Sequence, residues 1–225
     1  CNSSQNQKKM TENIDNNPLL VESTLPYGAP DFSKIKDEHY RPALLKGMAL
    51  QNERIAAITS NNEVPTFENT IVALEKSGVE LERASAVFNA LTEAHTNDTL
   101  KVLQKELSPK FAEHADDIHL NEKLFARIKA LYDKRESLQL DAESLKLLEN
   151  YYEDFEVAGA NLSAADKETL KKYNSELASL ETDFNQTLLE GSLAAAQTIN
   201  GQKVAIVNTT QQPLLSELAD RNQRK

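Results

Sequence analysis

The sequence has no tryptophan and contains only one cysteine, six glycines and seven prolines among 225 residues. A single cysteine excludes an internal disulfide framework and any zinc site built from cysteines. No apolar run approaches the length that a helix needs to cross a bilayer. Leu, Ala, Glu, Lys and Asn dominate instead, and this mixture predicts an all-α protein. The length suffices for one large domain or two small ones with a sizeable core.

Basic residues are also fewer than acidic residues. The 25 Lys and Arg residues stand against 35 Asp and Glu, which gives a formal net charge of −10. An acidic surface repels phosphate backbones and anionic lipid headgroups, and it promotes solubility. We therefore expect no nucleic-acid partner, and we expect a monomer.

The one cysteine is residue 1, and residues 2–17 are nearly free of apolar side chains. This arrangement resembles the mature end of a bacterial lipoprotein, in which the N-terminal cysteine carries the lipid. We expect lipid attachment at Cys1, a disordered tether over residues 1–17, and membrane contact only through that lipid. The expected location is the outer membrane, facing the periplasm. A cloning remnant, an internal start at Met10 and a cytoplasmic location are the alternatives.

Helical periodicity is clearest from Pro65 to Leu91, where apolar residues recur at steps of three, four and seven. We predict one helix here, capped by Thr66, with a close backbone contact or a bend at Gly78. Before it, residues 18–37 hold three prolines and predict an extended segment. Further helices are predicted over 38–59, from about 99 to 118 with a kink at Pro109, after Asn121, and from about 145 to Gly159, with a break over 137–141.

The most regular stripe follows Ser163, which begins a long helix with Asp166 three residues on, a variant of the capping box. Such spacing favours long antiparallel helices packed at small angles, as in a bundle or a coiled-coil hairpin. The stripe comprises Leu170, Tyr173, Leu177, Leu180, Phe184 and Leu188.

The pattern changes beyond Gly191. Asn200-Gly201 is a strong signal for a tight turn, and Val204 to Val207 is a short β-prone run, so we expect a short hairpin near residues 198–207. After the polar residues 208–213, LLSELADRNQRK begins one more predicted helix.

No zinc motif is found in the sequence. An HExxH site needs two histidines one helical turn apart with a glutamate between them, and none of the four histidines has this spacing. His114 and His119 are five residues apart, or about 140° around a helix. A weak surface metal site is conceivable there with Glu113, Asp116 and Asp117, although acidic helical faces are usually only solvated.

For the remaining candidate residues, the sequence favours a structural role over a catalytic or binding role. His39 and His95 fall at a helix start and in a turn, which favours capping or packing. Tyr151, Tyr152 and Phe155 could line a peptide groove, but core packing is the favoured interpretation. No phosphate loop, Gly-x-Ser-x-Gly elbow or Cys/His pair is present in the sequence. The sequence therefore predicts no catalytic, metal-binding or cofactor-binding residue.

Several blocks in order resemble the N-terminal region of bacterial peptidyl-dipeptidases (dipeptidyl carboxypeptidases), which are relatives of thimet oligopeptidase and neurolysin. The blocks include TFENTIVALEKSG, AHTNDTL and NTTQQPLLSELADR, and the resemblance extends over residues 16–225. It implies a helical N-terminal half, over residues 18–225, of a two-lobed enzyme with a deep channel. Zinc lies at the floor of that channel, on an HExxH helix and a downstream Glu, and the enzymes release C-terminal dipeptides from oligopeptides.

This sequence departs from the family pattern in two ways. It ends before the region where the family has HExxH, so no catalytic or zinc residue can be assigned to it. The link before NTTQQP is also shorter than in the family. The resemblance predicts a channel-wall domain that is inactive alone, with Zn²⁺ expected only in the full-length parent and oligopeptides as substrates of that parent. The alternatives are a lipid-anchored helical module that binds a peptide or protein, and a non-functional truncated product.

Overall fold

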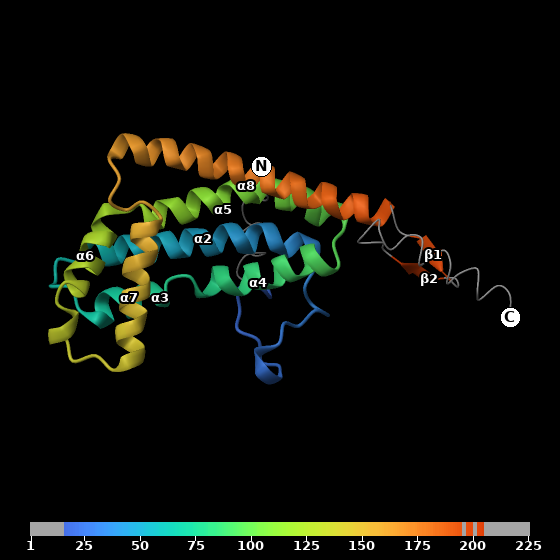
Figure 1. The fold of residues 1–225 in the computed structure, drawn as a ribbon. Helices are drawn as coiled ribbons and strands as arrows, with labels where there is room; N and C mark the ends of the chain where they lie inside the picture. The colour runs from blue at the N-terminus through green and yellow to red at the C-terminus, as the bar shows by residue number, and fades with distance from the viewer. Residues whose placement is uncertain (1–15, 195–196, 200–201, 205–225) are drawn as a thin grey trace, which may run out of the picture. The chain divides into compact units, whose positions relative to one another are not determined.

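The computed structural model describes residues 16–194, 197–199 and 202–204, and helices dominate these residues, so the all-α prediction is confirmed (Figure 1). The chain forms two compact units, Cys1–Glu176 and Leu177–Lys225. No described helix is both long and apolar enough to span a membrane. The elements are η1 (Pro26–Gly28), α2 (Asp37–Ser60), η2 (Phe67–Val72), α3 (Ala73–Glu75), α4 (Val79–Ala94), α5 (Asp98–His119), α6 (Glu122–Tyr132), η3 (Arg135–Ser137), α7 (Ala142–Val157), α8 (Ala164–Ala194), β1 (Gln197–Ile199) and β2 (Gln202–Val204).

Helix α2 contributes to both hydrophobic cores of the first unit. Its N-terminal half packs with α4 and the start of α5, and its C-terminal half packs with η2, α3, α6 and α7 (Figure 1). The first core comprises Leu19, Tyr40, Ala43, Leu44, Ala84, Val87, Phe88, Leu100, Leu103 and Leu107. The second comprises Ile55, Ile58, Ile71, Leu74, Ile118, Leu124, Phe125, Ile128, Leu131, Leu148, Phe155 and Ala160.

A glycine lets α2 and α4 approach closely. A Cβ added to Gly47 of α2 would lie 2.8 Å from the Cα of Leu81 in α4, and the backbone there cannot move aside. The absence of a side chain at Gly47 therefore sets the distance between the two helices.

The helix predicted from Pro65 to Leu91 is divided into three, which corrects that prediction. A π-helical turn, η2, leads into the single turn of α3, and α4 begins only at Val79. The predicted cap is confirmed, because the Thr66 Oγ1 accepts from the Asn69 N–H. The bend predicted at Gly78 is also confirmed. Gly78 precedes α4, and a Cβ there would lie 2.7 Å from the Gln51 Nε2.

The buried Arg127 and the half-buried Asn69 form a polar junction that the apolar pattern did not reveal. The Asn69 Oδ1 accepts from the Thr66 N–H and from the Arg127 Nη2, at 2.8 Å in each case. The Arg127 Nη1 donates to the carbonyl oxygens of Asn61 and Glu63. Arg127 of α6 thereby fixes the loop between α2 and η2 by satisfying carbonyls that the loop would otherwise leave unpaired.

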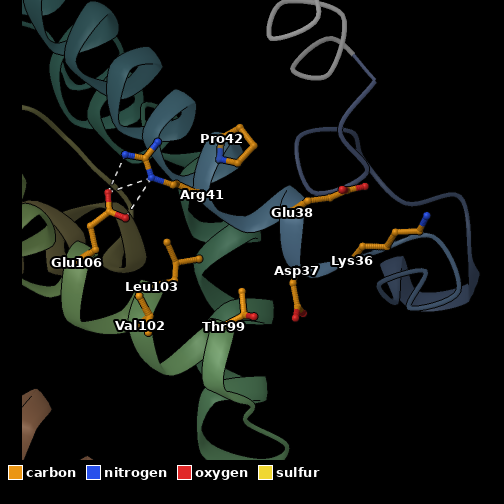
Figure 2. Close-up of a pocket in the computed structure, with 9 residues that line it drawn as sticks. All are labelled: Lys36, Asp37, Glu38, Arg41, Pro42, Thr99, Val102, Leu103 and Glu106. Carbon is orange, nitrogen blue, oxygen red and sulfur yellow. Dashed lines mark hydrogen bonds and ion pairs between the residues drawn. The ribbon is translucent and has the colours of Figure 1, made fainter. Parts of the chain in front are cut away.

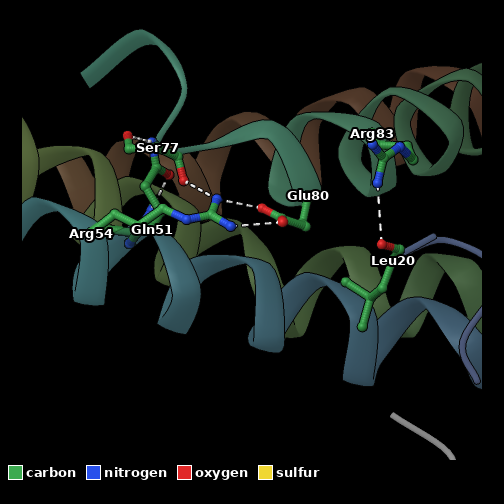
Figure 3. Close-up of polar contacts among 7 residues, drawn as sticks. Leu20, Gln51, Arg54, Ser77, Glu80 and Arg83 are labelled. Carbon is green, nitrogen blue, oxygen red and sulfur yellow. Dashed lines mark hydrogen bonds and ion pairs between the residues drawn. The ribbon is translucent and has the colours of Figure 1, made fainter. Parts of the chain in front are cut away.

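A second set of contacts ties α2 to the start of α4 (Figure 3). The Arg54 Nη2 lies 2.7 Å from the Glu80 Oε1, and the Arg54 Nη1 donates to the Ser77 carbonyl at 2.8 Å. The Arg83 Nη1 donates to the Leu20 carbonyl at 3.2 Å, which attaches the extended N-terminal segment to α4.

The other helix boundaries largely follow the sequence signals. Asn97, Asn121 and Ser163 each accept a backbone N–H at the start of the next helix. The predicted break over 137–141 is present, and α5 continues through Pro109 as one helix.

The stripe on α8 is the main departure from the sequence prediction. Its side chains were expected to pack against a neighbouring helix, yet Leu170 is only half-buried and the other five are 53–67% exposed. On other sides of α8, Lys167, Thr182 and Gln186 are buried instead. Periodicity identifies an apolar face, but it does not say which segment covers that face.

The hairpin expected near 198–207 is confirmed. β1 and β2 pair antiparallel, with Gln197 opposite Val204. The Asn200-Gly201 turn, the helix predicted from Leu214, and Cys1 lie outside the described residues. So does nearly all of the predicted tether over 1–17, whose last residue, Asn17, is buried and donates to the His39 carbonyl.

We predict that Gly47→Ala lowers the free energy of unfolding by roughly 1–3 kcal/mol, because its Cβ would press on the Leu81 backbone. Gly191→Ala is the matched control, since nothing lies within 4 Å of a Cβ there and alanine favours a helix by about 0.5–1 kcal/mol. Urea unfolding followed by circular dichroism measures both. Equal stability of the two variants would contradict a close contact at Gly47.

We predict that Arg127→Met lowers the free energy of unfolding by about 1–3 kcal/mol, because three partly buried acceptors lose their donor. Lys129→Met on the same helix removes the same charge, an exposed pair with Asp133 and a contact of the ammonium with the Tyr152 ring, and we expect a loss of about 0.5–1 kcal/mol. The same unfolding measurement compares them. A loss at position 127 no larger than that at position 129 would show that the junction is dispensable.

Candidate functional site

The histidines that the sequence singled out do not gather in one place. The His39 Nδ1 accepts from the Lys36 N–H, which confirms a capping role, and His95 directly follows the last residue of α4. His114 is buried, with its Nε2 2.8 Å from the Gln51 Oε1. His119 lies against the ring of Phe155, with 5.1 Å between ring centroids.

The metal site considered on α5 is therefore not assembled. His114 and His119 have different partners, and Asp117 pairs with Lys171 at 2.8 Å. In the described part of the chain, no three His, Cys, Asp or Glu side chains are placed to hold a metal ion. The donor set that a zinc ion requires is not found among these residues.

Tyr151 and Tyr152 face different surroundings. Tyr152 stacks on Tyr132 with 3.8 Å between centroids and also lies near Phe125, while Phe155 is fully buried. Core packing, the favoured interpretation, is confirmed for Tyr152 and Phe155. Tyr151 also packs against this core, and its hydroxyl donates a hydrogen bond to the Glu75 carboxylate.

A small cavity of about 130 Å³, with both polar and apolar lining, brings together residues from α2, α3, α4, α5 and α7. Its lining includes His119, Tyr151 and Phe155 with Gln51 and Glu75. Burial, and then the contact with Glu75, raises the pKa of Tyr151, so its phenol stays protonated and acts as a donor. The sequence did not indicate Gln51 or Glu75, because they come from helices that only the tertiary fold brings together. This cavity can hold a water or a small polar group, but it is too small for a peptide.

The larger groove lies between the start of α2 and α5, with a volume of about 860 Å³ (Figure 2). Val102, which is 68% exposed, and Leu103 form an apolar floor with Pro42. Charged side chains of both signs border it. They are Lys36, Asp37, Glu38, Arg41 and Glu106.

Arg41 of α2 and Glu106 of α5 form an ion pair with two Arg41 nitrogens at one edge of this groove. The Arg41 Nε and Nη2 lie 3.0 and 2.8 Å from the Glu106 Oε1. The hydrogen bond from Arg41 holds the pKa of Glu106 below its ordinary value, so the carboxylate stays ionised. An apolar floor with paired charges suits binding of an extended polar chain, and no two of the nine lining side chains form a nucleophile–base pair.

Comparison with known proteins identifies relatives of this chain. The chain is 44% identical to the dipeptidyl carboxypeptidase of Escherichia coli (strain K12) across 93% of its own length. It is 40% identical to the dipeptidyl carboxypeptidase of Salmonella typhimurium across 94%. The chain is homologous to part of the bacterial dipeptidyl carboxypeptidases.

The homology covers only part of these enzymes, because the chain spans about a third of their length, 35% in both cases. A more distant similarity, at 25% identity over 83% of the chain, is to oligopeptidase A of Haemophilus influenzae. No family model matches the chain. The resemblance inferred from the sequence blocks is thus confirmed, and it extends through both the groove and the small cavity.

We predict that His114 makes stability depend on pH. Burial lowers the pKa of His114 below 6.5, and the nearby Asp117 only partly opposes this. The unfolded chain therefore binds more protons as pH falls below 6.5, and the free energy of unfolding decreases toward the lower folded pKa.

The test compares urea unfolding between pH 7 and 5 for the wild type, His114→Gln and His95→Gln. The wild type and His95→Gln, whose histidine is exposed, should lose stability over this range, and His114→Gln should lose less. Parallel pH dependence in all three would exclude His114 as the cause.

Proposed function

We propose that this chain is the N-terminal part of a peptidase that releases C-terminal dipeptides from oligopeptides, and that it forms one wall of the substrate channel. The supporting observation is 44% identity to a dipeptidyl carboxypeptidase over 93% of the chain. A wall of this kind limits substrates to unfolded peptides that are short enough to enter the channel.

The groove between α2 and α5 is the part of this wall that we assign to peptide contact. Its volume of about 860 Å³ falls in the range of ligand-binding clefts. The apolar floor would hold a side chain of an extended peptide, and the bordering charges would meet its backbone and polar groups. The Arg41–Glu106 pair fixes one edge of the groove before the peptide arrives, which lowers the ordering cost of binding.

Hydrolysis, in this proposal, requires residues outside the chain. Dipeptide release by a zinc peptidase depends on a metal-activated water that attacks the peptide carbonyl. The donor side chains in the described residues do not fit a zinc ion, so no catalytic step is assigned to them. The isolated chain should bind peptide weakly and cleave none.

The experiment incubates the isolated 225-residue chain with an oligopeptide and Zn²⁺ and measures dipeptide release by mass spectrometry. We expect no release, whereas zinc-dependent release would contradict the assignment of catalysis to another part of the enzyme.

Binding is tested separately by the fluorescence anisotropy of a labelled oligopeptide. We predict that Val102→Glu weakens the affinity at least fivefold, because it places a charge on the apolar floor of the groove. Val157→Glu on α7 is the matched control, since Val157 is also exposed but lies outside the groove. Equal affinities of the two variants, or no binding by the wild type, would contradict the assignment of peptide contact to the groove.

We also propose that Cys1 carries the lipid of an outer-membrane lipoprotein that faces the periplasm. The supporting observation is the polar sequence that follows the cysteine. Mass spectrometry of the N-terminal peptide from native cells tests this. A diacylglyceryl thioether on Cys1 is expected, and an unmodified cysteine in a cytoplasmic fraction would contradict it.

A further inference from the structure

A pocket that the proposed function does not use lies between the N-terminal segment, residues 18–36, and α4. This N-terminal pocket has a volume of about 360 Å³, at the lower end of the range for ligand-binding clefts. The segment turns at Tyr27 and Gly28, which both have positive φ, and residues before and after that turn line the pocket. It shares no lining residue with the groove between α2 and α5.

Apolar side chains form the floor and part of the rim of the N-terminal pocket. Leu19 and Val87 are buried and Ile35 is half-buried, so these three form the floor. Val21 and Leu25 also line the pocket and are 55% and 42% exposed. An apolar side chain of a ligand would cover this surface and would itself be removed from water.

Four charged side chains line the N-terminal pocket, and they balance in sign. Lys34 and Asp31 form an ion pair at 2.8 Å, so their charges largely cancel. The other two, Arg83 and Glu22, have no ion pair among the described residues. The pocket therefore offers a ligand one cation and one anion beside an apolar floor.

Arg83 retains hydrogen-bond donors for a ligand. Its Nη1 donates to the Leu20 carbonyl at 3.2 Å (Figure 3), and a guanidinium carries five N–H donors in all. The carboxylate of Glu80, one turn before Arg83 on α4, is bound by two nitrogens of Arg54. A ligand carboxylate is the group that the remaining donors of Arg83 fit best.

The backbone beside Arg83 is also open to a ligand. Among the described residues, no hydrogen bond uses the backbone N–H or carbonyl of Val21, Glu22 or Thr24. Such groups can pair with the main chain of an extended ligand. Glu22 follows Leu20 by two residues, which span at most about 7 Å. The two ends of a dipeptide are separated by a similar length, because it is also two residues long.

We propose that the N-terminal pocket binds a free dipeptide with an apolar C-terminal side chain. The carboxylate of the dipeptide binds Arg83, and its ammonium pairs with Glu22. Its C-terminal side chain lies on Leu19 and Val87, since Val87 is one helical turn after Arg83 and shares its face of α4. Dipeptides are also what the proposed peptidase would release, but the chemistry of this pocket does not depend on that activity.

An NMR titration of the ¹⁵N-labelled 225-residue chain with alanyl-leucine tests this proposal. We expect the amide signals of residues 21–25 and of Arg83 to shift. Alanyl-leucine amide lacks the carboxylate and should bind at least tenfold more weakly, because a charged hydrogen bond is lost. N-acetyl-alanyl-leucine lacks the ammonium and should bind about threefold more weakly, because Glu22 is exposed.

Two variants assign each end of the dipeptide to its partner. Arg83→Gln should bind alanyl-leucine and its amide equally weakly, and Glu22→Gln should no longer distinguish alanyl-leucine from its acetylated form. Lys172→Gln and Glu153→Gln are the matched controls, because they remove the same charges at exposed positions outside the pocket and should keep both preferences. Circular dichroism checks that each variant keeps its helices.

Alanyl-leucine that shifts no signal, or shifts only the signals of Val102 and Leu103 in the groove, would overturn the proposal. So would an effect of amidation that is as large in Arg83→Gln as in the wild type. These results concern a different pocket and a different ligand from the oligopeptide tests of the groove. Failure here is therefore distinguishable from failure of the proposed function.

Discussion

The close approach of α2 and α4 at Gly47 is the constraint on which the first unit depends. Both cores contain residues of α2, so the position of α4 against that helix determines how the first core closes. Gly47 permits the approach, and the bidentate contact of Arg54 with Glu80 holds the start of α4 in place. The groove between α2 and α5 follows from the same arrangement, because both of its walls belong to helices of the first core.

The side-chain polar contacts of the described residues join elements of the fold to one another. Arg127 and Asn69 fix a loop, His114 and Gln51 join α5 to α2, and Tyr151 joins α7 to α3. Among the described residues, the groove between α2 and α5 and the apolar face of α8 both expose apolar side chains. The proposed role as one wall of a substrate channel rests on homology to about a third of a dipeptidyl carboxypeptidase.

Helix positions, most caps and the hairpin could be predicted from the sequence, because they depend on local chemistry. Thr66, Asn121 and Ser163 cap the elements that begin at the next residue, and the Asn200-Gly201 signal falls between β1 and β2. The division of the 65–91 helix could not be predicted fully, because the tertiary contacts of the π-helical turn, such as the hydrogen bond from Arg127 to Asn69, 58 residues away, are not contained in the local sequence. The exposure of the α8 stripe and the gathering of Glu75 with Tyr151 also depend on tertiary contacts, which periodicity does not contain.

The central claim is that these residues act as one part of a longer peptidase, and the intact mass of the native protein tests it most directly. The protein would be purified from its own cells with an antibody against the first unit and then weighed by mass spectrometry. The account predicts a mass far above 25.1 kDa, together with dipeptide release by the purified material. A mass near 25.1 kDa, with or without a lipid, would contradict it and would leave a binding module or a non-functional product as the alternatives.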